Sequence, residues 1–261
     1  MSDVRPVFVV VGVGSGGGTG AATARLFAKE GYSVALIARS LDRVTKLEDE
    51  IKLAGGQAHG FPVSSYSYSD VTKVFQQIKQ HSWPSNPKAE IRAALWNASG
   101  ENWGHFLNIT EEKINDTVQS DIIGPFAFSR EAILAFQANT IDSLGRRGTL
   151  LFTGATASLR GNVTTSAFAA GKFAVRALSQ SLAKEFGKQN IHVAQVIIDG
   201  GILTDYGTER RPAGEAPEAY ITNEDVRLDP NSIAKTYLYL TNQDRSAWTW
   251  ELDLRPAHEK W

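Results

Sequence analysis

Residues 12–20 combine glycine with small hydroxyl residues in a pattern that suits phosphate binding. A short apolar run precedes this segment and a helical pattern follows it. Glycine accepts backbone angles that other residues avoid, and it lets the chain approach a pyrophosphate closely. The N-terminus of the following helix adds free N–H groups and a positive dipole end. The segment therefore predicts a turn that binds the phosphates of a dinucleotide.

Two registers of the glycines fit such a turn. Gly12, Gly14 and Gly17 satisfy one spacing, whereas Gly14, Gly18 and Gly20 satisfy another. We favour the second register because the two alanines after residue 20 then open the helix at the expected distance. The residues predicted to bind the cofactor here are Gly14, Ser15, Gly18, Thr19 and Gly20.

The end of the next apolar run, at residues 33–37, bears on the choice between NAD and NADP. An acidic residue there holds the ribose 2′-hydroxyl of NAD, and a basic residue accommodates the 2′-phosphate of NADP. This sequence has Arg39 and Ser40 and no carboxylate at that point. A guanidinium beside a hydroxyl suits a phosphate monoester, so we predict NADP as the cofactor. The alternative is an ordinary solvated arginine.

These residues need a scaffold that brings strand ends together. Short β-branched apolar runs alternate with helical periodicity almost from end to end, which predicts an α/β fold with a Rossmann-type, doubly wound parallel sheet. No linker divides the chain, so we predict a single domain over residues 1–261, with a mobile loop at 204–222. Strands are predicted at 7–11, 33–37, 57–63, 91–96, 148–153, 191–198 and 247–252, and helices at 21–30, 40–53, 69–79, 110–139, 165–186 and 231–239.

Composition excludes several classes of function. The formal net charge is −1, which argues against binding to nucleic acid or to an anionic membrane surface. The chain has no cysteine, so disulfides, a thiolate nucleophile and a cysteine-ligated metal are excluded. Histidines and acids do not cluster at metal-ligand spacing, so no metal is expected. We see no secretory signal and no apolar stretch of about 18 residues, so we expect a cytoplasmic protein.

Several ordered segments resemble the short-chain dehydrogenase/reductase family over essentially the whole chain. They are the glycine turn, the segments 96–100 and 158–161, the helix that carries Lys172, and the Asp199-Gly200 pair with Thr204. The resemblance implies that Lys172 holds the nicotinamide ribose and that Thr204 bonds the carboxamide. It further implies contacts of the cofactor with Asn97, Ala98, Gly200 and Ile202.

The family's catalytic residues are mostly replaced in this sequence. In the family, a Tyr-x-x-x-Lys pair, a serine and an asparagine carry out the chemistry. The spacing puts Phe168 at the tyrosine position, Ala155 at the serine position and Asp121 at the asparagine position, and only Lys172 remains. Phenylalanine has no proton to give and alanine cannot bond an oxyanion, so ordinary carbonyl reduction should be badly impaired.

Other side chains near the expected pocket could replace the missing groups. Asp121 could handle a proton if burial raised its pKa, or it could simply pair with Lys172. Arg130 could face the pocket or form a helix-surface ion pair. His105 could be an acid or a wall residue, and Tyr206 could close over the site from the loop. The remaining polar candidates are Thr156, Ser158, Thr165 and Asp199. Trp96 and Trp103 suggest a bulky, apolar or aromatic substrate, and core packing explains Trp96 equally well.

Three functions fit these observations. The first is an NADPH-dependent reductase of an activated C=N, C=O or C=C bond with a non-standard proton source. The second is a cyclase or isomerase, because the fungal reductase/Diels–Alderases resemble this chain in their loss of catalytic residues and in the arginine at Arg130. Those proteins carry an acid where this chain has Thr165. The third is a cofactor-binding protein without turnover. The family resemblance also implies a small-molecule substrate and a homodimer or homotetramer.

Overall fold

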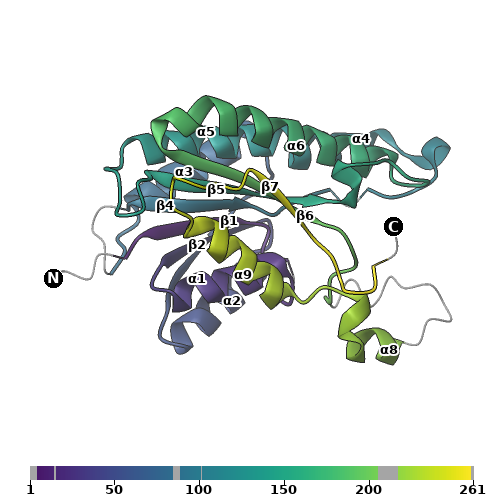
Figure 1. The fold of residues 1–261 in the computed structure, drawn as a ribbon, viewed down its shortest axis with the longest axis horizontal. Coiled ribbons are helices and arrows are strands. Elements are labelled where there is room, and N and C mark those ends of the chain that lie inside the picture. The colour runs from purple at the N-terminus through teal and green to yellow at the C-terminus, as the bar shows by residue number, and fades with distance from the viewer. Residues whose placement is uncertain (1–4, 15, 85–88, 101, 205–216, 260–261) are drawn as a thin grey trace.

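One parallel sheet organises the protein (Figure 1). The computed structural model describes residues 5–14, 16–84, 89–100, 102–204 and 217–259. Within them, seven strands form one sheet in the order β3-β2-β1-β4-β5-β6-β7, and every neighbouring pair is parallel. The predicted fold class, a single α/β Rossmann-type sheet, is therefore confirmed. The strands are β1 (Val7–Val11), β2 (Ser33–Ala38), β3 (Gln57–Pro62), β4 (Ile91–Trp96), β5 (Gly148–Ala155), β6 (Ile191–Ile198) and β7 (Glu251–Leu254).

Helices cover both faces of the sheet (Figure 1). One apolar cluster joins α3, α5 and α6 to one face, and a second joins α1, α2 and α9 to the other. Because both faces are covered, β1 is apolar and buried along its whole length, and β2 is buried along its whole length, rather than alternating. The helices are α1 (Thr19–Lys29), α2 (Leu41–Leu53), α3 (Tyr68–Gln80), α4 (Glu111–Val118), α5 (Gly124–Gln137), α6 (Ser166–Phe186), α8 (Pro217–Thr222) and α9 (Pro230–Thr241).

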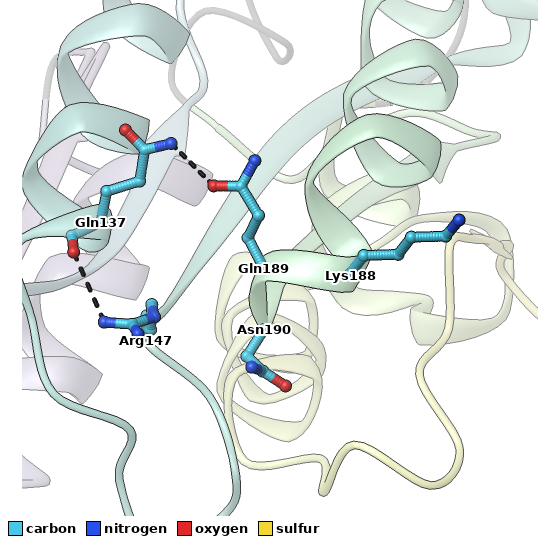
Figure 2. A pocket seen from close by; sticks show the side chains of 5 residues that line it. All are labelled: Gln137, Arg147, Lys188, Gln189 and Asn190. Carbon is cyan, nitrogen blue, oxygen red and sulfur yellow. Dashed lines mark hydrogen bonds between the residues drawn. The ribbon is translucent and has the colours of Figure 1, made fainter.

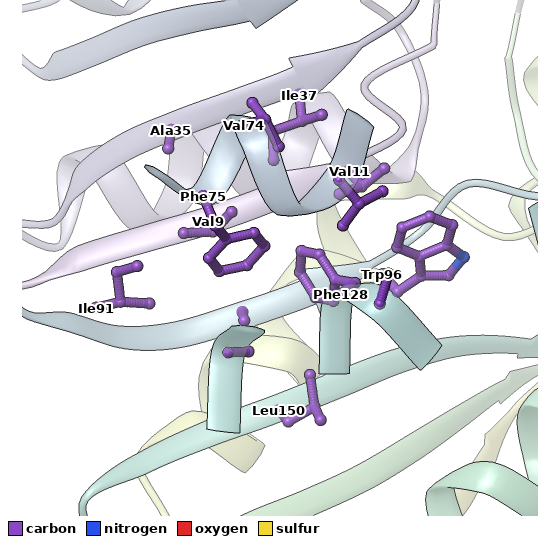
Figure 3. Packing of buried hydrophobic residues seen from close by; sticks show 14 of the residues in the cluster. Val9, Val11, Ala35, Ile37, Val74, Phe75, Ile91, Trp96, Phe128 and Leu150 are labelled. Carbon is purple, nitrogen blue, oxygen red and sulfur yellow. The ribbon is translucent and has the colours of Figure 1, made fainter. Parts of the chain in front are cut away.

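Figure 3 shows part of the first cluster, where aromatic side chains fill the space between sheet and helices. Phe128 of α5 packs edge-on against Phe75 of α3 and Trp96 of β4, with ring centroids 5.4 Å apart in each pair. Trp96 is fully buried, and its indole nitrogen donates to the backbone oxygen of Ser120, 3.1 Å away. Trp96 is therefore a core residue, which is one of the two alternatives that the sequence left open for it.

The strand order reverses direction between β1 and β4. Successive strands β1, β2 and β3 run outward on one side, and β4 to β7 run outward on the other. In such sheets the loops after the two central strands diverge and leave a crevice at the carboxyl edge. The glycine turn follows β1 and the segment 97–100 follows β4, so the topology brings the two predicted cofactor segments to this crevice.

The predicted long helix over 110–139 is interrupted by a π-helical segment. Helix α4 ends at Val118, the π-helical segment η2 covers Gln119–Ile123, and α5 begins at Gly124. A π-bulge inserts an extra residue into a turn, and such bulges are frequent at functional sites. Apolar periodicity alone does not reveal it, because the helix continues on both sides.

The last strand lies further along the chain than predicted. We expected it at 247–252, whereas β7 covers Glu251–Leu254. The side chain of Gln243 bonds both the backbone nitrogen and the hydroxyl of Thr249, which holds the preceding residues in a turn. Trp248 stacks on His192 in this turn, so the apolar residues that suggested a strand pack without entering the sheet.

The segment 204–222 was predicted as a loop, and its described end is helical. Helix α8 covers Pro217–Thr222, and residues 205–216 lie outside the described part of the chain. Arg227 is buried and donates to the backbone oxygens of Tyr220 and Ile221, which anchors the end of α8. The prediction of a loop is therefore wrong for residues 217–222, which are helical.

Candidate functional site

The glycine turn is built by a close approach of two chain segments. Gly12 has φ +89°, and a Cβ on it would lie 2.6 Å from the backbone nitrogen of Ala98. A Cβ on Gly20, in the first turn of α1, would lie only 2.2 Å from the backbone oxygen of Gly12. No side chain fits at either place, so these two glycines allow β1, α1 and the segment after β4 to meet.

The middle of the turn is open where the two ends are crowded. Gly14 has φ +61° and Gly16 has φ +104°, and a Cβ on either would meet no described heavy atom within 4 Å. These glycines are required for conformation and leave room beside the backbone. Gly18 is the N-cap of α1, so the free N–H groups of the helix follow it. Ser15, also predicted here, lies outside the described residues.

Thr19 offers an unused hydroxyl at the start of α1. Its residue is buried, and its Oγ1 has no hydrogen-bond partner among the described residues. A buried polar atom without a partner is unfavourable unless a ligand or water satisfies it. The hydroxyl, the helix N-terminus and the open glycines together fit the phosphates of a dinucleotide.

Arg25 braces the turn from within α1 and was missed by sequence reasoning. Its Nη1 donates to the backbone oxygen of Gly16 over 2.8 Å. Its Nε and Nη2 bond both carboxylate oxygens of Glu50 in α2, at 2.6 and 2.8 Å. The spacing between Arg25 and Gly16 in the sequence gives no signal for this contact, because it depends on the path of the turn.

Arg39 and Ser40 lie directly after β2, at the crevice edge. The guanidinium of Arg39 lies 3.3 Å from a carboxylate oxygen of Asp116 in α4 and 5.1 Å from the ring centre of Tyr66. Ser40 is the N-cap of α2, and its side chain makes no capping hydrogen bond. The pair therefore presents a cation and a hydroxyl side by side, and Asp116 is the neighbour that the sequence did not indicate.

Lys172 and Asp121 form a buried ion pair beneath the site. The exposed fractions of the two residues are 3% and 1%, and the Nζ of Lys172 lies 3.6 Å from Oδ1 of Asp121. The Nζ also donates to the backbone oxygen of Thr153 in β5 over 3.1 Å. The sequence alternative of a pair between these two residues is thus what the structure shows. A Cβ on Gly171 would lie 2.7 Å from Cβ of Asp121, so this glycine lets the two helices come together.

The carboxylate of Asp121 is fully engaged by short-range donors. Ser99 donates its hydroxyl to Oδ1 over 2.9 Å. The backbone nitrogen of Gly100 and the hydroxyl of Ser120 donate to Oδ2, at 3.0 and 2.8 Å. These donors occupy both carboxylate oxygens, so Asp121 holds Lys172 and the segment 99–100 in place.

Phe168 lies near the ion pair, Ala155 ends β5, and neither carries a polar side-chain atom. Phe168 is one helical turn before Lys172 on α6, and the Nζ of Lys172 lies 5.7 Å from its ring centre. The indole ring of Trp103, which is 49% exposed, lies 5.5 Å from the ring of Phe168. Ala155 ends β5 and donates its backbone nitrogen to the hydroxyl of Ser158 over 3.1 Å. Phe168 and Trp103 therefore form an aromatic surface, Ala155 is apolar, and the family's tyrosine and serine positions offer no proton donor.

The remaining polar candidates are already paired. Ser158 is fully buried and bonded as above, and Thr165 bonds the backbone nitrogen and oxygen of Asn162, at 2.8 and 2.9 Å. Thr156 donates its hydroxyl to Asp199, whose other oxygen accepts from Nε of Arg255 over 2.7 Å. Burial alone would raise the pKa of Asp199, but the bonds from Thr156 and Arg255 outweigh it and lower that pKa. Asp199 is therefore a structural carboxylate here.

The segment after β6 approaches the glycine turn. Gly200 has φ +152°, and Ile202 forms an isolated parallel bridge with Leu228. A Cβ on Gly18 would lie 3.6 Å from Cγ2 of Thr204, so Thr204 lies beside the start of α1. The structure thus brings Gly200, Ile202 and Thr204 to the same end of the sheet as the glycine turn. Tyr206 lies outside the described residues.

Arg130 and His105 are placed on the surface. Arg130 is on α5, its side chain is 57% exposed, and its Nη1 lies 2.7 Å from Oε1 of Glu131. This ion pair is the alternative that the sequence offered to a pocket-facing arginine. His105 is exposed in the loop before the short helix Phe106–Asn108. Neither residue joins the cluster formed by Lys172 and Asp121.

A separate polar hollow lies at the other end of the sheet (Figure 2). It has a volume of about 370 Å³ and lies beside the residues that precede β5 and β6. Its side chains bond within the molecule: Gln137 donates to Gln189 over 2.7 Å, and Arg147 donates to the backbone oxygen of Gln137 over 3.4 Å. This hollow contains none of the predicted site residues. It is lined by Gln137, Arg147, Lys188, Gln189 and Asn190.

The described residues contain neither a cluster of metal ligands nor a helix that could span a membrane. No group of three or more His, Cys, Asp or Glu residues there could hold a metal ion. No helix in the described part of the chain is long and apolar enough to cross a membrane.

The family model described as short chain dehydrogenase matches residues 8–214, well over half of the chain. The chain belongs to the short-chain dehydrogenase family. This match includes the glycine turn, the segment after β4 and the helix that carries Lys172, so the resemblance drawn from those segments is confirmed at the level of the family.

Three of the proteins that this chain matches are named as a reductase, a dehydrogenase and a ketoreductase. A 3-oxoacyl-[acyl-carrier-protein] reductase of Mus musculus is 30% identical over 193 residues, which are 74% of each protein. A crystal structure of a short-chain dehydrogenase from Rhodopseudomonas palustris is 29% identical, with a TM-score of 0.74, and the match covers 97% of this chain and 99% of that one. The actinorhodin polyketide ketoreductase, solved with NADPH, has the same fold at 20% identity, with a TM-score of 0.82 and coverage of 98% and 99%.

Proposed function

We propose that this short-chain dehydrogenase is an NADPH-dependent reductase of an activated double bond, such as a C=N bond already present as an iminium ion. The observation that carries the proposal is a combination of two features. The glycine turn and Thr19 fit the phosphates of a dinucleotide, whereas the side chains at the family's tyrosine and serine positions are apolar. Lys172 and Asp121 form a buried pair, while Phe168 beside Lys172 and Ala155 at the end of β5 offer no proton.

The cofactor part of the proposal rests on the chain's own residues. The phosphates would bind at the open glycines and at the hydroxyl of Thr19, which has no partner in the described part of the chain. Arg39 and Ser40 would hold the 2′-phosphate, which favours NADP over NAD. Lys172 would donate to the nicotinamide ribose. The actinorhodin ketoreductase supports this choice, because its structure contains NADPH.

The proposed reaction follows from the chemistry of the side chains around the reaction site. NADPH supplies a hydride when bound. A neutral ketone also needs a proton and an oxyanion donor, and these groups contribute about 10²–10⁴-fold and about 10²–10³-fold to rate. An iminium ion needs neither group, because its positive charge already activates the carbon. The aromatic faces of Phe168 and Trp103 attract a cation through their ring quadrupoles, which suits the same substrate.

The mouth of the site favours a bulky, apolar substrate. The loop after β4 exposes Trp103, Phe106 and Leu107, and the loop after β5 exposes Val163. The backbone nitrogen of Gly104 donates to the backbone oxygen of Thr164 over 2.9 Å, so the two loops are joined. Exposed apolar side chains gathered beside a reaction site are a common feature of ligand-binding surfaces.

Titration of the purified protein with NADPH, NADP⁺, NADH and NAD⁺ tests the cofactor assignment. A ligand at about 100 times its Kd should add about 2.7 kcal/mol to the free energy of unfolding, which thermal denaturation detects easily. We expect stabilisation by the phosphorylated pair only. Equal stabilisation by NADH would contradict the role of Arg39, and no stabilisation by any of the four would contradict the cofactor site.

Oxidation of NADPH, followed by its absorbance, tests the reaction. We expect turnover with cyclic imines at a pH where they are protonated, and none with simple ketones. The double change Phe168→Tyr with Ala155→Ser should raise ketone reduction above the wild-type level. NADPH that binds but is not oxidised with any imine would favour the alternative of a binding protein without turnover.

A further inference from the structure

A buried hydrogen-bond chain runs from α9 across the sheet to the glycine turn. Tyr237 of α9 is fully buried, and its hydroxyl lies 2.7 Å from Oγ1 of Thr153 in β5. The same Oγ1 lies 2.7 Å from Oδ1 of Asn97 after β4. The Nδ2 of Asn97 donates to the backbone oxygen of Gly12 after β1, also over 2.7 Å. Four elements are thus linked by three short contacts.

The backbone oxygen at one end of this hydrogen-bond chain determines the direction of every hydrogen bond in it. The backbone oxygen of Gly12 can only accept, so the amide nitrogen of Asn97 must face it and the amide oxygen must face Thr153. Thr153 then gives its one hydroxyl proton to Asn97. The hydroxyl of Tyr237 must therefore donate to Thr153. Burial raises the pKa of Tyr237 and keeps this phenol protonated.

A second arm of the chain reaches the ion pair. The backbone oxygen of Thr153 accepts from Nζ of Lys172 over 3.1 Å. The strand residue that Tyr237 contacts therefore also holds the lysine that we assign to the nicotinamide ribose. One hydroxyl on α9 is connected both to the phosphate end and to the ribose end of the proposed cofactor site.

The surroundings of Asn97 leave little freedom for it to move. A Cβ on Gly20 would lie 2.9 Å from its Nδ2, and a Cβ on Gly12 would lie 2.9 Å from its backbone carbonyl carbon. The backbone nitrogen of Gly12 in turn donates to the backbone oxygen of Ile37 over 3.0 Å. A change in the Asn97 amide is thus transmitted to the backbone of the turn, because close-packed atoms cannot absorb it.

We propose that Tyr237 is a positioning residue of the dinucleotide site, whose hydroxyl orients the Asn97 amide through Thr153 and so holds the glycine turn in its binding conformation. The inference rests on the proposed function for the identity of the ligand. The conformational part can be measured without any ligand.

Tyr237→Phe removes the hydroxyl and keeps the ring that packs against the sheet. We expect about three- to tenfold weaker NADPH binding by calorimetry, as the loss of one net hydrogen bond predicts. We also expect faster amide hydrogen exchange at residues 12–20 in the ligand-free protein. Tyr32→Phe is the matched control: this residue is also buried, but it precedes β2 at the opposite end of the sheet. The control should change neither the Kd nor the exchange at residues 12–20.

Thr153→Val provides a second variant that breaks the same chain and keeps the backbone oxygen that binds Lys172. If the chain acts as a unit, the double variant with Tyr237→Phe should bind NADPH no more weakly than the worse of the two single variants. Additive losses would overturn the proposal. An unchanged Kd and unchanged exchange in Tyr237→Phe, or equal changes in Tyr32→Phe, would also overturn it.

The two proposals fail in different ways. A wild-type protein that binds none of the four dinucleotides contradicts the proposed function, while the exchange experiment still decides the role of Tyr237. A wild-type protein that binds NADPH, with Tyr237→Phe equal to it in both measurements, contradicts only the positioning role.

Discussion

At the scale of single residues, Arg39 is the side chain that we propose to distinguish NADP from NAD. Its guanidinium is held between Asp116 and the ring of Tyr66, at the end of β2. An exposed ion pair of this kind contributes little to stability, so a phosphate can take over the guanidinium at small cost. Arg39 is thus oriented before the ligand arrives.

Arg39→Ala should weaken NADPH binding about tenfold or more and leave NADH binding unchanged, because a charge-assisted bond to phosphate contributes about 1.5–3 kcal/mol. Calorimetric titration with both cofactors measures this. Arg43→Ala, on the exposed surface of α2, removes the same charge nearby and serves as the control. Equal weakening in both variants would mean that only the general field of the surface matters.

At the scale of elements, the loop before α6 contains a strained residue. Thr164 has φ +68°, in the left-handed region that β-branched residues rarely adopt. Its backbone oxygen accepts from Gly104, so this conformation joins the two loops at the mouth of the site. Strain of this kind persists where the surroundings fix the backbone, and it is common at functional sites.

Thr164→Asn should raise the free energy of unfolding by about 1 kcal/mol, because asparagine tolerates left-handed angles better than threonine. Urea denaturation measures the change. Val163→Asn is the control, since its backbone is not left-handed and its side chain is exposed. The prediction fails if the two variants have the same stability.

The strands and helices followed from the sequence where local pattern decides them. Apolar runs such as residues 7–11 and 191–198 became buried strands, because a sheet covered on both faces needs continuous apolar side chains. The position of β7 along the chain did not follow from the sequence, because Trp248 and Thr249 belong to a turn that the side chain of Gln243 stabilises. Tertiary contacts decided there against local propensity.

The candidate site was predictable in its short-range parts and not in its long-range ones. The glycine spacing and the positions of Lys172 and Asp121 are visible in the sequence, and the structure places the two side chains together. The contacts of Arg25 with Gly16 and of Tyr237 with Thr153 have no sequence signal. They join residues whose approach depends on how the sheet and helices pack.

At the scale of the whole molecule, one helical layer leaves large apolar side chains uncovered. Phe126 of α5 is 54% exposed, and Phe173 of the neighbouring α6 is 42% exposed. Ile122 of the π-helical segment and Leu134 of α5 are also exposed. We propose that this face is the contact surface of a homodimer or homotetramer.

Phe126→Asp should convert the assembly to a monomer, because a charge at the centre of an apolar contact is costly to bury. Light scattering after size-exclusion chromatography measures the mass. Leu53→Asp changes a residue that is 89% exposed at the end of α2, on the other side of the sheet, and should leave the mass unchanged. A wild-type monomer would contradict the proposal directly.

The stability of the whole domain should fall as the pH drops below about 6.5. Burial lowers the pKa of His192, whose ring stacks on Trp248, so the folded protein keeps this histidine neutral. Below pH 6.5 the unfolded chain binds a proton at this histidine more readily than the folded chain does. The free energy of unfolding therefore decreases as the pH falls.

Urea denaturation at pH 7.5 and pH 5.5 measures this loss. His192→Gln should remove about 1 kcal/mol of the difference between the two pH values. His258→Gln, at a side chain that is 67% exposed, should leave the difference as in the wild type. An unchanged difference in His192→Gln would place the pH dependence elsewhere.

The hydrogen-bond chain between Tyr237 and Gly12 also bears on how the protein is made. The glycine segment precedes α9 in the sequence, so a ribosome releases it well before α9. A nascent or truncated chain therefore carries the phosphate-binding sequence without the hydroxyl that orients it. A ligand stabilises only the conformation that binds it, so a dinucleotide would favour chains in which α9 has docked. Cofactor binding would thus protect chains with a docked α9 from proteolysis more than chains in which α9 is not yet in place.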